Sequence, residues 1–204
     1  MPSNTLGNPL ITAAAYQSGG MSPAPRYLNS YAPNDLRGKH HLGFWYNQLT
    51  IAGQTITFED WSSNKFFDKS TLSPGNASLS GLNYHVLRYA DLLLTYAEAQ
   101  NEADGSPNSE AYKAVNAIRE RAGLEPVSGL SQGAFREEVW KQRYWELDLE
   151  GWLWFDMVRT HKMFDGTSMV DAVGFVMPGG AIFKEENLKF PIPLSEININ
   201  PLLK

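Results

Sequence analysis

Three acidic residues, Glu146, Asp148 and Glu150, follow Arg143 closely and form the densest charged group of the chain. Two carboxylates about 5 to 10 Å apart are the chemistry of glycoside hydrolysis. Glu146 and Glu150 would share one face of a helix, where like charges repel unless each of them meets a cation. Arginines that could supply this charge stand at three positions, Arg88, Arg143 and Arg159. We therefore interpret the acids as a structural ion-pair network and predict no catalytic residue.

A second candidate group consists of aromatic residues in a segment with little helical periodicity. Trp45, Tyr46 and Trp61 lie in this segment. A flat aromatic face stacks on the apolar C–H face of a sugar ring, while neighbouring Asn and Asp side chains can satisfy its hydroxyls. We predict that these three residues form a carbohydrate-binding site, and the alternative is that they pack onto the helices. The aromatics of the helical segments are interpreted mainly as core: Trp140, Trp145, Trp152, Trp154 and Phe155.

Other kinds of site find no support in the residue pattern. The chain has no cysteine and only four histidines, and the H-E-x-x-H, P-loop and G-x-S-x-G motifs are absent. We predict neither a metal site nor a cofactor. The net charge is −5, and no run of Lys and Arg forms a patch, which argues against nucleic acid as a partner. No apolar run reaches the ~18 residues of a membrane span.

The elements that must position these residues are mostly helical. Apolar residues at helical spacing predict helices over 85–103, 108–122, 132–148 and 152–161. Between the first two helices, we expect Gly105 to end one, Ser106 to cap the next and Pro107 to stand in its first turn. Gly123 supplies the left-handed position that closes the second helix. Two helices with a short connection pack antiparallel, as a hairpin of about the tetratricopeptide size.

The chain divides into three segments by composition. Residues 1–83 are expected to be loop-rich, with the aromatic cluster, a turn in which Asp35 accepts from backbone donors, and a small β-hairpin at 49–58. Residues 84–165 form the helical core, and 166–204 a loop and an extended tail that packs on it. The first 35 residues have the composition of a connecting loop, with no signal peptide, so we expect the chain to be the later part of something longer.

Four stretches in this order resemble segments of the SusD/RagB family. Leu87–Ala99, with the letters LRYADLLLTYAEA, is similar to the family's RYADvLLmYAEA helix. Ala114–Leu124, Glu146–Met157 and Phe190–Ile197 resemble three further family segments. The resemblance covers about residues 26 to 204.

This family comprises surface lipoproteins of Bacteroidetes that bind nutrients, usually glycans such as starch. The resemblance implies a mainly α fold, an α/α superhelix of tetratricopeptide-like hairpins, and a non-catalytic function in nutrient uptake and polysaccharide utilization. The implied partners are an oligosaccharide or polysaccharide and a SusC-like TonB-dependent transporter. The implied location is the outer membrane at the cell surface, through a lipid anchor absent from this chain. Since full-length members are longer, the resemblance also implies that this chain is the C-terminal half of such a protein. The alternative is a helical-repeat scaffold for protein partners, with no sugar site of its own in this half.

Overall fold

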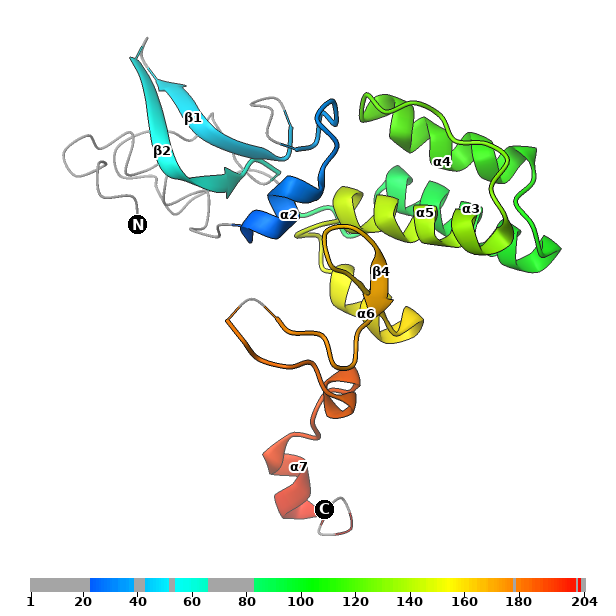
Figure 1. Cartoon of the computed structure of the whole chain (residues 1–204). Coiled ribbons are helices and arrows are strands. Elements are labelled where there is room, and N and C mark those ends of the chain that lie inside the picture. The colour runs from blue at the N-terminus through cyan, green and yellow to red at the C-terminus, as the bar shows by residue number, and fades with distance from the viewer. Residues whose placement is uncertain are drawn as a thin grey trace.

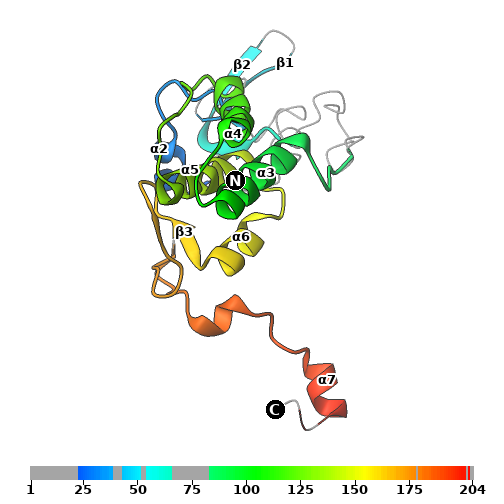
Figure 2. The same ribbon diagram turned by 90° about the vertical axis from the view of Figure 1, so that its right-hand side faces the viewer.

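Three consecutive helices form the centre of the structure. They are α3 (Tyr89–Asp104), α4 (Ser109–Arg121) and α5 (Gln132–Glu146), and α3 packs against both of the others (Figures 1 and 2). The structure is a computed structural model that describes residues 23–38, 43–51, 54–65, 83–177, 179–200 and 202. The three helices predicted over this part of the chain are confirmed, and so is the mainly α fold class.

Small and branched apolar residues hold these three helices together. Leu94 and Ala97 of α3, Val115 of α4, and Phe135 and Val139 of α5 are all fully buried in one cluster. Burying a side chain of the size of Leu or Phe stabilises the fold by about 1.5 to 3 kcal/mol. Ala97 of α3 and Ala111 of α4 are buried in the same cluster, where small side chains leave room for the neighbouring helix.

The turn between α3 and α4 differs in detail from the prediction. Gly105 ends α3 in the left-handed conformation, with φ of 69°, as expected. Asn108 rather than Ser106 caps α4, because its side-chain oxygen accepts from the Ala111 amide at 3.0 Å. Pro107 therefore precedes the cap instead of standing in the first turn. Asn108 is the cap because it lies three residues before Ala111, whose backbone amide has no partner within the helix, and this is the spacing that a cap requires.

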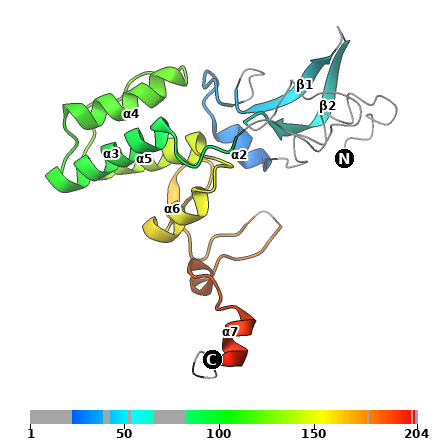
Figure 3. The same cartoon turned by 180° about the vertical axis from the view of Figure 1, so that it is seen from behind.

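A short helix joins the helical centre to a β-hairpin. α2 (Pro25–Ser30) lies between the central helices and the antiparallel strands β1 (Trp45–Ile51) and β2 (Gln54–Ser63), as Figure 3 shows from behind. The hairpin predicted at 49–58 is confirmed, but it is longer at both ends. A register irregularity between Tyr46 and Gln48 lets pairing continue to Trp45 and Ser63.

The C-terminal part winds away from the helices. α6 (Leu153–Thr160), which was predicted, is followed by an unpredicted antiparallel pair, β3 (Lys162–Phe164) and β4 (Met169–Asp171). The short 3-10 helix η2 (Glu185–Leu188) still packs on α6 through the buried Leu188.

Beyond Leu188 the chain leaves the body of the molecule, and α7 (Leu194–Ile199) stands apart from the other helices (Figures 1 and 2). The side chains of Phe190, Leu194 and Ile199 are exposed by 70% or more. We expected the whole tail to pack on the helical core. The structure differs after Leu188, where Phe190 contacts the Trp154 ring with one face and Leu194 and Ile199 stay exposed.

Candidate functional site

The acidic group at the end of α5 is held by cations from distant segments. Glu146 is fully buried, and its carboxylate pairs with Arg88 at 3.1 Å, with Arg37 at 3.6 Å and with Arg121. A buried carboxylate with three guanidinium partners holds these segments together, because removing any one of them would weaken the compensation of a buried charge. The predicted ion-pair network is confirmed, although only Arg88 of the three predicted arginines takes part in it.

Glu150 is the second acid of this network. Its carboxylate accepts from Lys65 Nζ at 2.7 Å and from Arg88 Nε at 2.7 Å. Burial alone would raise the pKa of Glu150, but these two hydrogen bonds hold that pKa below its usual range. Lys65 also donates to the backbone carbonyls of Glu146 at 2.7 Å and Asp148 at 2.6 Å, and therefore fixes the turn that follows α5.

The two other predicted arginines pair elsewhere, because α6 brings its own acid to them. Arg143 lies between Asp91 of α3 and Asp156 of α6, at 2.8 Å from each carboxylate. Arg159 pairs with Asp156 at 2.8 Å and with Glu98 at 2.6 Å. These ion pairs connect α3, α5 and α6 and hold α6 in place beside the end of α5.

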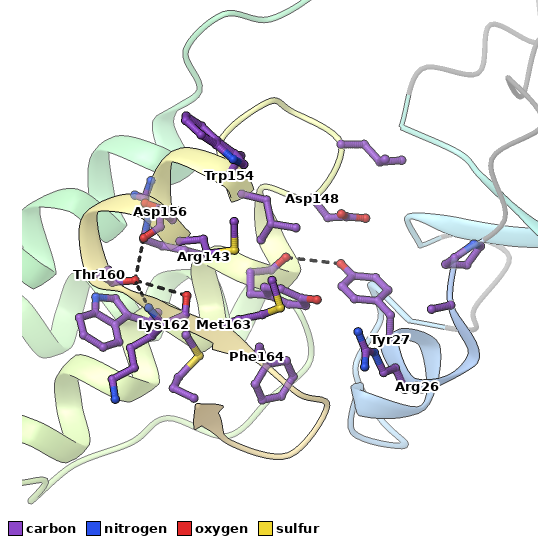
Figure 4. A pocket seen from close by; sticks show the side chains of 18 of the residues that line it. Arg26, Tyr27, Arg143, Asp148, Trp154, Asp156, Thr160, Lys162, Met163 and Phe164 are labelled. Carbon is purple, nitrogen blue, oxygen red and sulfur yellow. Dashed lines mark hydrogen bonds and ion pairs between the residues drawn. The ribbon is translucent and has the colours of Figure 1, made fainter. Parts of the chain in front are cut away.

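A cavity of about 570 Å³ opens between α2, the end of α5, α6 and β3 (Figure 4). Its size falls within the range of small-molecule sites in proteins, about 300 to 1,000 Å³. Aromatic rings and methionines dominate its walls. The rings are those of Tyr27, Trp45, Trp140, Tyr144, Trp154 and Phe164, and the methionines are Met157, Met163, Met169 and Met177.

Most polar groups in the wall of this cavity are engaged by neighbours. Thr160 donates to the Asp156 backbone carbonyl at 2.7 Å, and Lys162 pairs with Asp171 at 2.6 Å. Arg143 and Asp156 are bonded to each other, as described above. These groups make one side of the cavity in Figure 4 polar in composition but satisfied in its hydrogen bonding.

Two charged groups on the opposite side are differently placed. Asp148 and Arg26 lie near Tyr27 in Figure 4. Burial raises the pKa of the Asp148 carboxyl, and the charge of Lys65 together with hydrogen bonds from the Tyr27 side chain and the Leu149 backbone offsets this only in part. Arg26 is exposed and rests on the Phe175 ring, with 4.6 Å from its Cζ to the ring centre. These two side chains are the polar groups best placed to meet a ligand.

A sequence profile of the SusD family matches residues 33–204. The chain belongs to the SusD family. SusD-like protein P25 of Formosa agariphila is 35% identical to it over 125 residues, which are 59% of this chain and 23% of P25. This chain therefore spans about a quarter of the length of that relative.

Solved structures of the SusD superfamily share the fold. A protein from Parabacteroides distasonis, 38% identical, superposes with a TM-score of 0.79 over 88% of this chain and 40% of its own. Surface glycan-binding protein A from Bacteroides uniformis is 24% identical, with a TM-score of 0.60 over 87% of this chain and 39% of its own. The second likeness shows the fold alone. Together these findings confirm the family resemblance read from the sequence.

Within this SusD fold, the three predicted sugar-binding aromatics do not form an exposed platform. Trp45 and Tyr46 keep only 3% and 2% of their side chains exposed, and Trp61 is half-buried beside the Tyr27–Trp45 cluster. Trp45 and Tyr46 offer no exposed face, because strand β1 places them against Tyr27 of α2 and Phe58 of β2. Only Trp45 of the three also lines the cavity. Sugar binding by these residues stays a prediction.

The sequence interpretation missed the residues that α6 and α2 contribute. Trp154 was assigned to the core, yet it is half-buried, lines the cavity and stacks on Phe190 with ring centres 4.2 Å apart. Tyr27 comes from a segment in which only a turn was expected. No local signal joins positions more than 100 residues apart, so the cavity was not visible in the sequence.

In the part of the chain that the structure describes, no group of three or more His, Asp or Glu side chains could hold a metal ion. His40 and His41 lie outside the described residues. Of the described helices, none has the length and apolarity needed to cross a membrane.

Proposed function

We propose that this chain is part of a non-catalytic, glycan-binding protein of the cell surface. It binds an oligosaccharide or polysaccharide and passes it to a SusC-like TonB-dependent transporter. The observation that carries the proposal is the aromatic-walled cavity of about 570 Å³, in a chain that belongs to the SusD family. The Bacteroides uniformis protein of the same fold is named as glycan-binding, which agrees with the proposal.

Binding without catalysis is the function that the acidic residues favour. A glycosidase needs one carboxylate as an acid and another as a nucleophile or base. Glu146 and Glu150 are each held by two or more cations and are not free for either role. The acids of the described cavity wall are Asp148 and Asp156, and Asp156 is paired with Arg143 and Arg159, so the wall does not offer two free carboxylates.

The location follows from the same family membership. We propose that the full-length protein lies at the outer membrane and is held at the cell surface by a lipid anchor. In this proposal the cavity binds the sugar, and the helical hairpin of α3 and α4 contacts the transporter.

A glycan array followed by isothermal titration calorimetry tests the sugar-binding function. Trp154→Ala should weaken the binding of the best glycan by about 1 to 3 kcal/mol, the usual contribution of one stacking contact. The matched control is Phe155→Ala, which removes the next aromatic of α6, exposed by 54% and outside the cavity wall. Equal affinity for the two variants, with unchanged melting, would contradict a sugar site in this cavity.

A protein-binding scaffold is the second candidate function, and an apolar stripe on α3 favours it. Tyr89, Leu92 and Tyr96 follow one another at helical spacing and are exposed by 73%, 62% and 43%. A contiguous exposed apolar stripe marks an interaction surface more often than a solvated one. Two results together would favour this function over the first. The chain would give no signal on the glycan array, and it would bind the transporter in a way that Leu92→Lys abolishes.

A further inference from the structure

The interior of the cavity is more apolar than an ordinary sugar requires. Four methionines, Met157, Met163, Met169 and Met177, contribute to its walls, together with Leu153. A thioether is at best a weak acceptor and donates nothing, so a sugar hydroxyl placed against it loses its water without gaining a partner. The methionine-lined part of the cavity therefore suits hydrocarbon rather than hydroxyl groups.

The polar side chains on this side of the wall are not available to bind sugar hydroxyls, because they already form hydrogen bonds or ion pairs with their neighbours. Thr160, Lys162 and Arg143 all have partners at 2.6 to 2.8 Å within the described chain. If one of these groups bonded to a ligand instead, its former partner would lose a hydrogen bond. The hydroxyl groups of a ligand must therefore bond to other residues of the cavity wall.

The opposite side of the cavity offers what the methionine side lacks. The Asp148 carboxylate accepts from Tyr27 and has further lone pairs, and the exposed Arg26 guanidinium, which donates to the Val176 carbonyl over 3.4 Å, has further N–H groups. Among the labelled rings, that of Phe164 lies between the two sides, and that of Trp154 lies at the α6 end of the cavity wall. The cavity thus combines hydrogen-bonding groups at Asp148 and Arg26 with a lining of methionines.

We propose that the cavity selects an O-acetylated glycan. The sugar hydroxyls meet Asp148 and Arg26, the ring stacks on an aromatic side chain, and the methyl of the acetyl ester lies among the methionines. This inference rests on the proposed glycan-binding function and narrows its ligand class. An unmodified sugar fits the same ring contacts but leaves the apolar side unfilled.

The test uses one glycan array printed twice, with acetylated xylan, glucomannan and pectin among its members. One copy is treated with mild alkali, which removes O-acetyl esters and leaves the glycosidic bonds intact. The proposal expects signals that are strong on the untreated copy and lost on the treated one. For the best oligosaccharide, titration calorimetry should show at least tenfold weaker binding after deacetylation.

A variant then tests whether the acetyl group lies against the methionines of the cavity. Met163→Gln keeps the length of the side chain but makes it polar, and it should bring the affinities for the acetylated and deacetylated oligosaccharide together. Val173→Gln is the matched control, since Val173 is 41% exposed and lies outside the cavity wall. The control should keep the tenfold preference of the unmodified chain.

The outcomes separate the two proposals. Equal signals on both copies, signals confined to glycans that never carried acetyl groups, or a preference that Met163→Gln leaves intact would overturn the acetyl proposal and leave glycan binding standing. No signal on either copy would overturn the proposed sugar-binding function itself.

Discussion

Lys65 Nζ lies 2.7 Å from Glu150 Oε1, although the two residues are 85 positions apart in the sequence. Both side chains are less than 10% exposed. The same ammonium binds two carbonyls of the turn after α5, so the end of β2 is fixed to the end of a helix from the other part of the fold. Removal of the Lys65 charge would leave Arg88 as the only one of these two cations on the buried Glu150 carboxylate, and removal of the Glu150 charge would leave the buried ammonium with neutral backbone carbonyls in place of a counter-ion.

Glu150→Gln should therefore destabilise the protein. Loss of one member of a buried ion pair costs up to about 3 to 5 kcal/mol, and the amide oxygen of Gln will recover part of it. Thermal unfolding followed by circular dichroism measures the effect. Glu186→Gln is the control, because Glu186 and its partner Lys184 are both exposed and their pair contributes little. Equal melting temperatures for the two variants would contradict a structural role for Glu150.

The pH dependence of this effect has a definite sign. The pKa of Glu150 is held below its usual range, so the stability that it contributes is present above the unfolded-state pKa and is lost as the pH falls through the folded-state pKa. The difference in melting temperature between the unmodified chain and Glu150→Gln should consequently shrink in acid. A difference that is constant from pH 7 to pH 3 would contradict this.

Asp148→Asn should have the opposite effect on stability. Burial raises the pKa of Asp148, so the folded state is most stable with this carboxyl protonated, and stability is lost as the pH rises through the folded-state pKa. The variant should melt higher than the unmodified chain at pH 7 and equally at pH 3. Asp171→Asn serves as the contrast, since Lys162 holds the pKa of Asp171 low and its removal brings no gain. A lower melting temperature of Asp148→Asn at pH 7 would show that the carboxylate is stabilising.

Trp45→Ala should cost about 3 to 5 kcal/mol of stability, the usual loss for a large buried ring. Trp45 packs edge-on against Tyr27, with ring centres 5.8 Å apart, and the smaller side chain leaves a void there. Phe190→Ala is the control, because that ring is 72% exposed. Urea unfolding gives both values. A Trp45→Ala protein that unfolds like the unmodified chain but no longer binds sugar would restore the original prediction of a binding platform.

The apolar stripe on α3 should make the isolated chain self-associate. Burying Leu92 and Tyr96 between two copies removes hydrocarbon surface from water, and a charge at either position would prevent it. Size-exclusion chromatography with light scattering should show a mass that rises with concentration, and Leu92→Lys should restore the monomer. Glu110→Lys, on the exposed start of α4, should leave the association unchanged. A monomer at all concentrations would rule the stripe out as a contact surface.

Local signals explain which parts of the fold the sequence predicted. The spacing of Leu94, Ala97 and Ala111 and the glycine at position 105 are properties of short segments, and they placed α3 and α4 to within a few residues. The pair β3 and β4 was missed because its turn depends on Asp165, whose carboxylate accepts from the amides of Thr167 and Ser168 at 2.8 and 2.9 Å. A single capping side chain in a Gly- and Met-containing stretch gives no periodic pattern.

The candidate site was harder to predict, because its parts come together only in three dimensions. Tyr27, Trp45, Asp148 and Trp154 belong to four different segments. Loop-borne aromatics were expected to be exposed, but Trp45 became part of a strand and was buried. The acids gave the better prediction, because two buried carboxylates close together require cations. The predicted shared helix face is wrong, since α5 ends at Glu146 and Glu150 lies in the turn that follows.

The consecutive packing of α3, α4 and α5 has a consequence for the order of folding. Contacts between neighbouring helices close short loops and form early, whereas contacts across long separations form late. The Lys65–Glu150 contact closes a loop of 85 residues, so it should be absent from the folding transition state. In stopped-flow experiments, Val139→Ala in α5 should slow refolding. Glu150→Gln should leave the refolding rate almost unchanged and accelerate unfolding. The Lys65–Glu150 ion pair therefore sets the lifetime of the native state rather than the rate at which it forms.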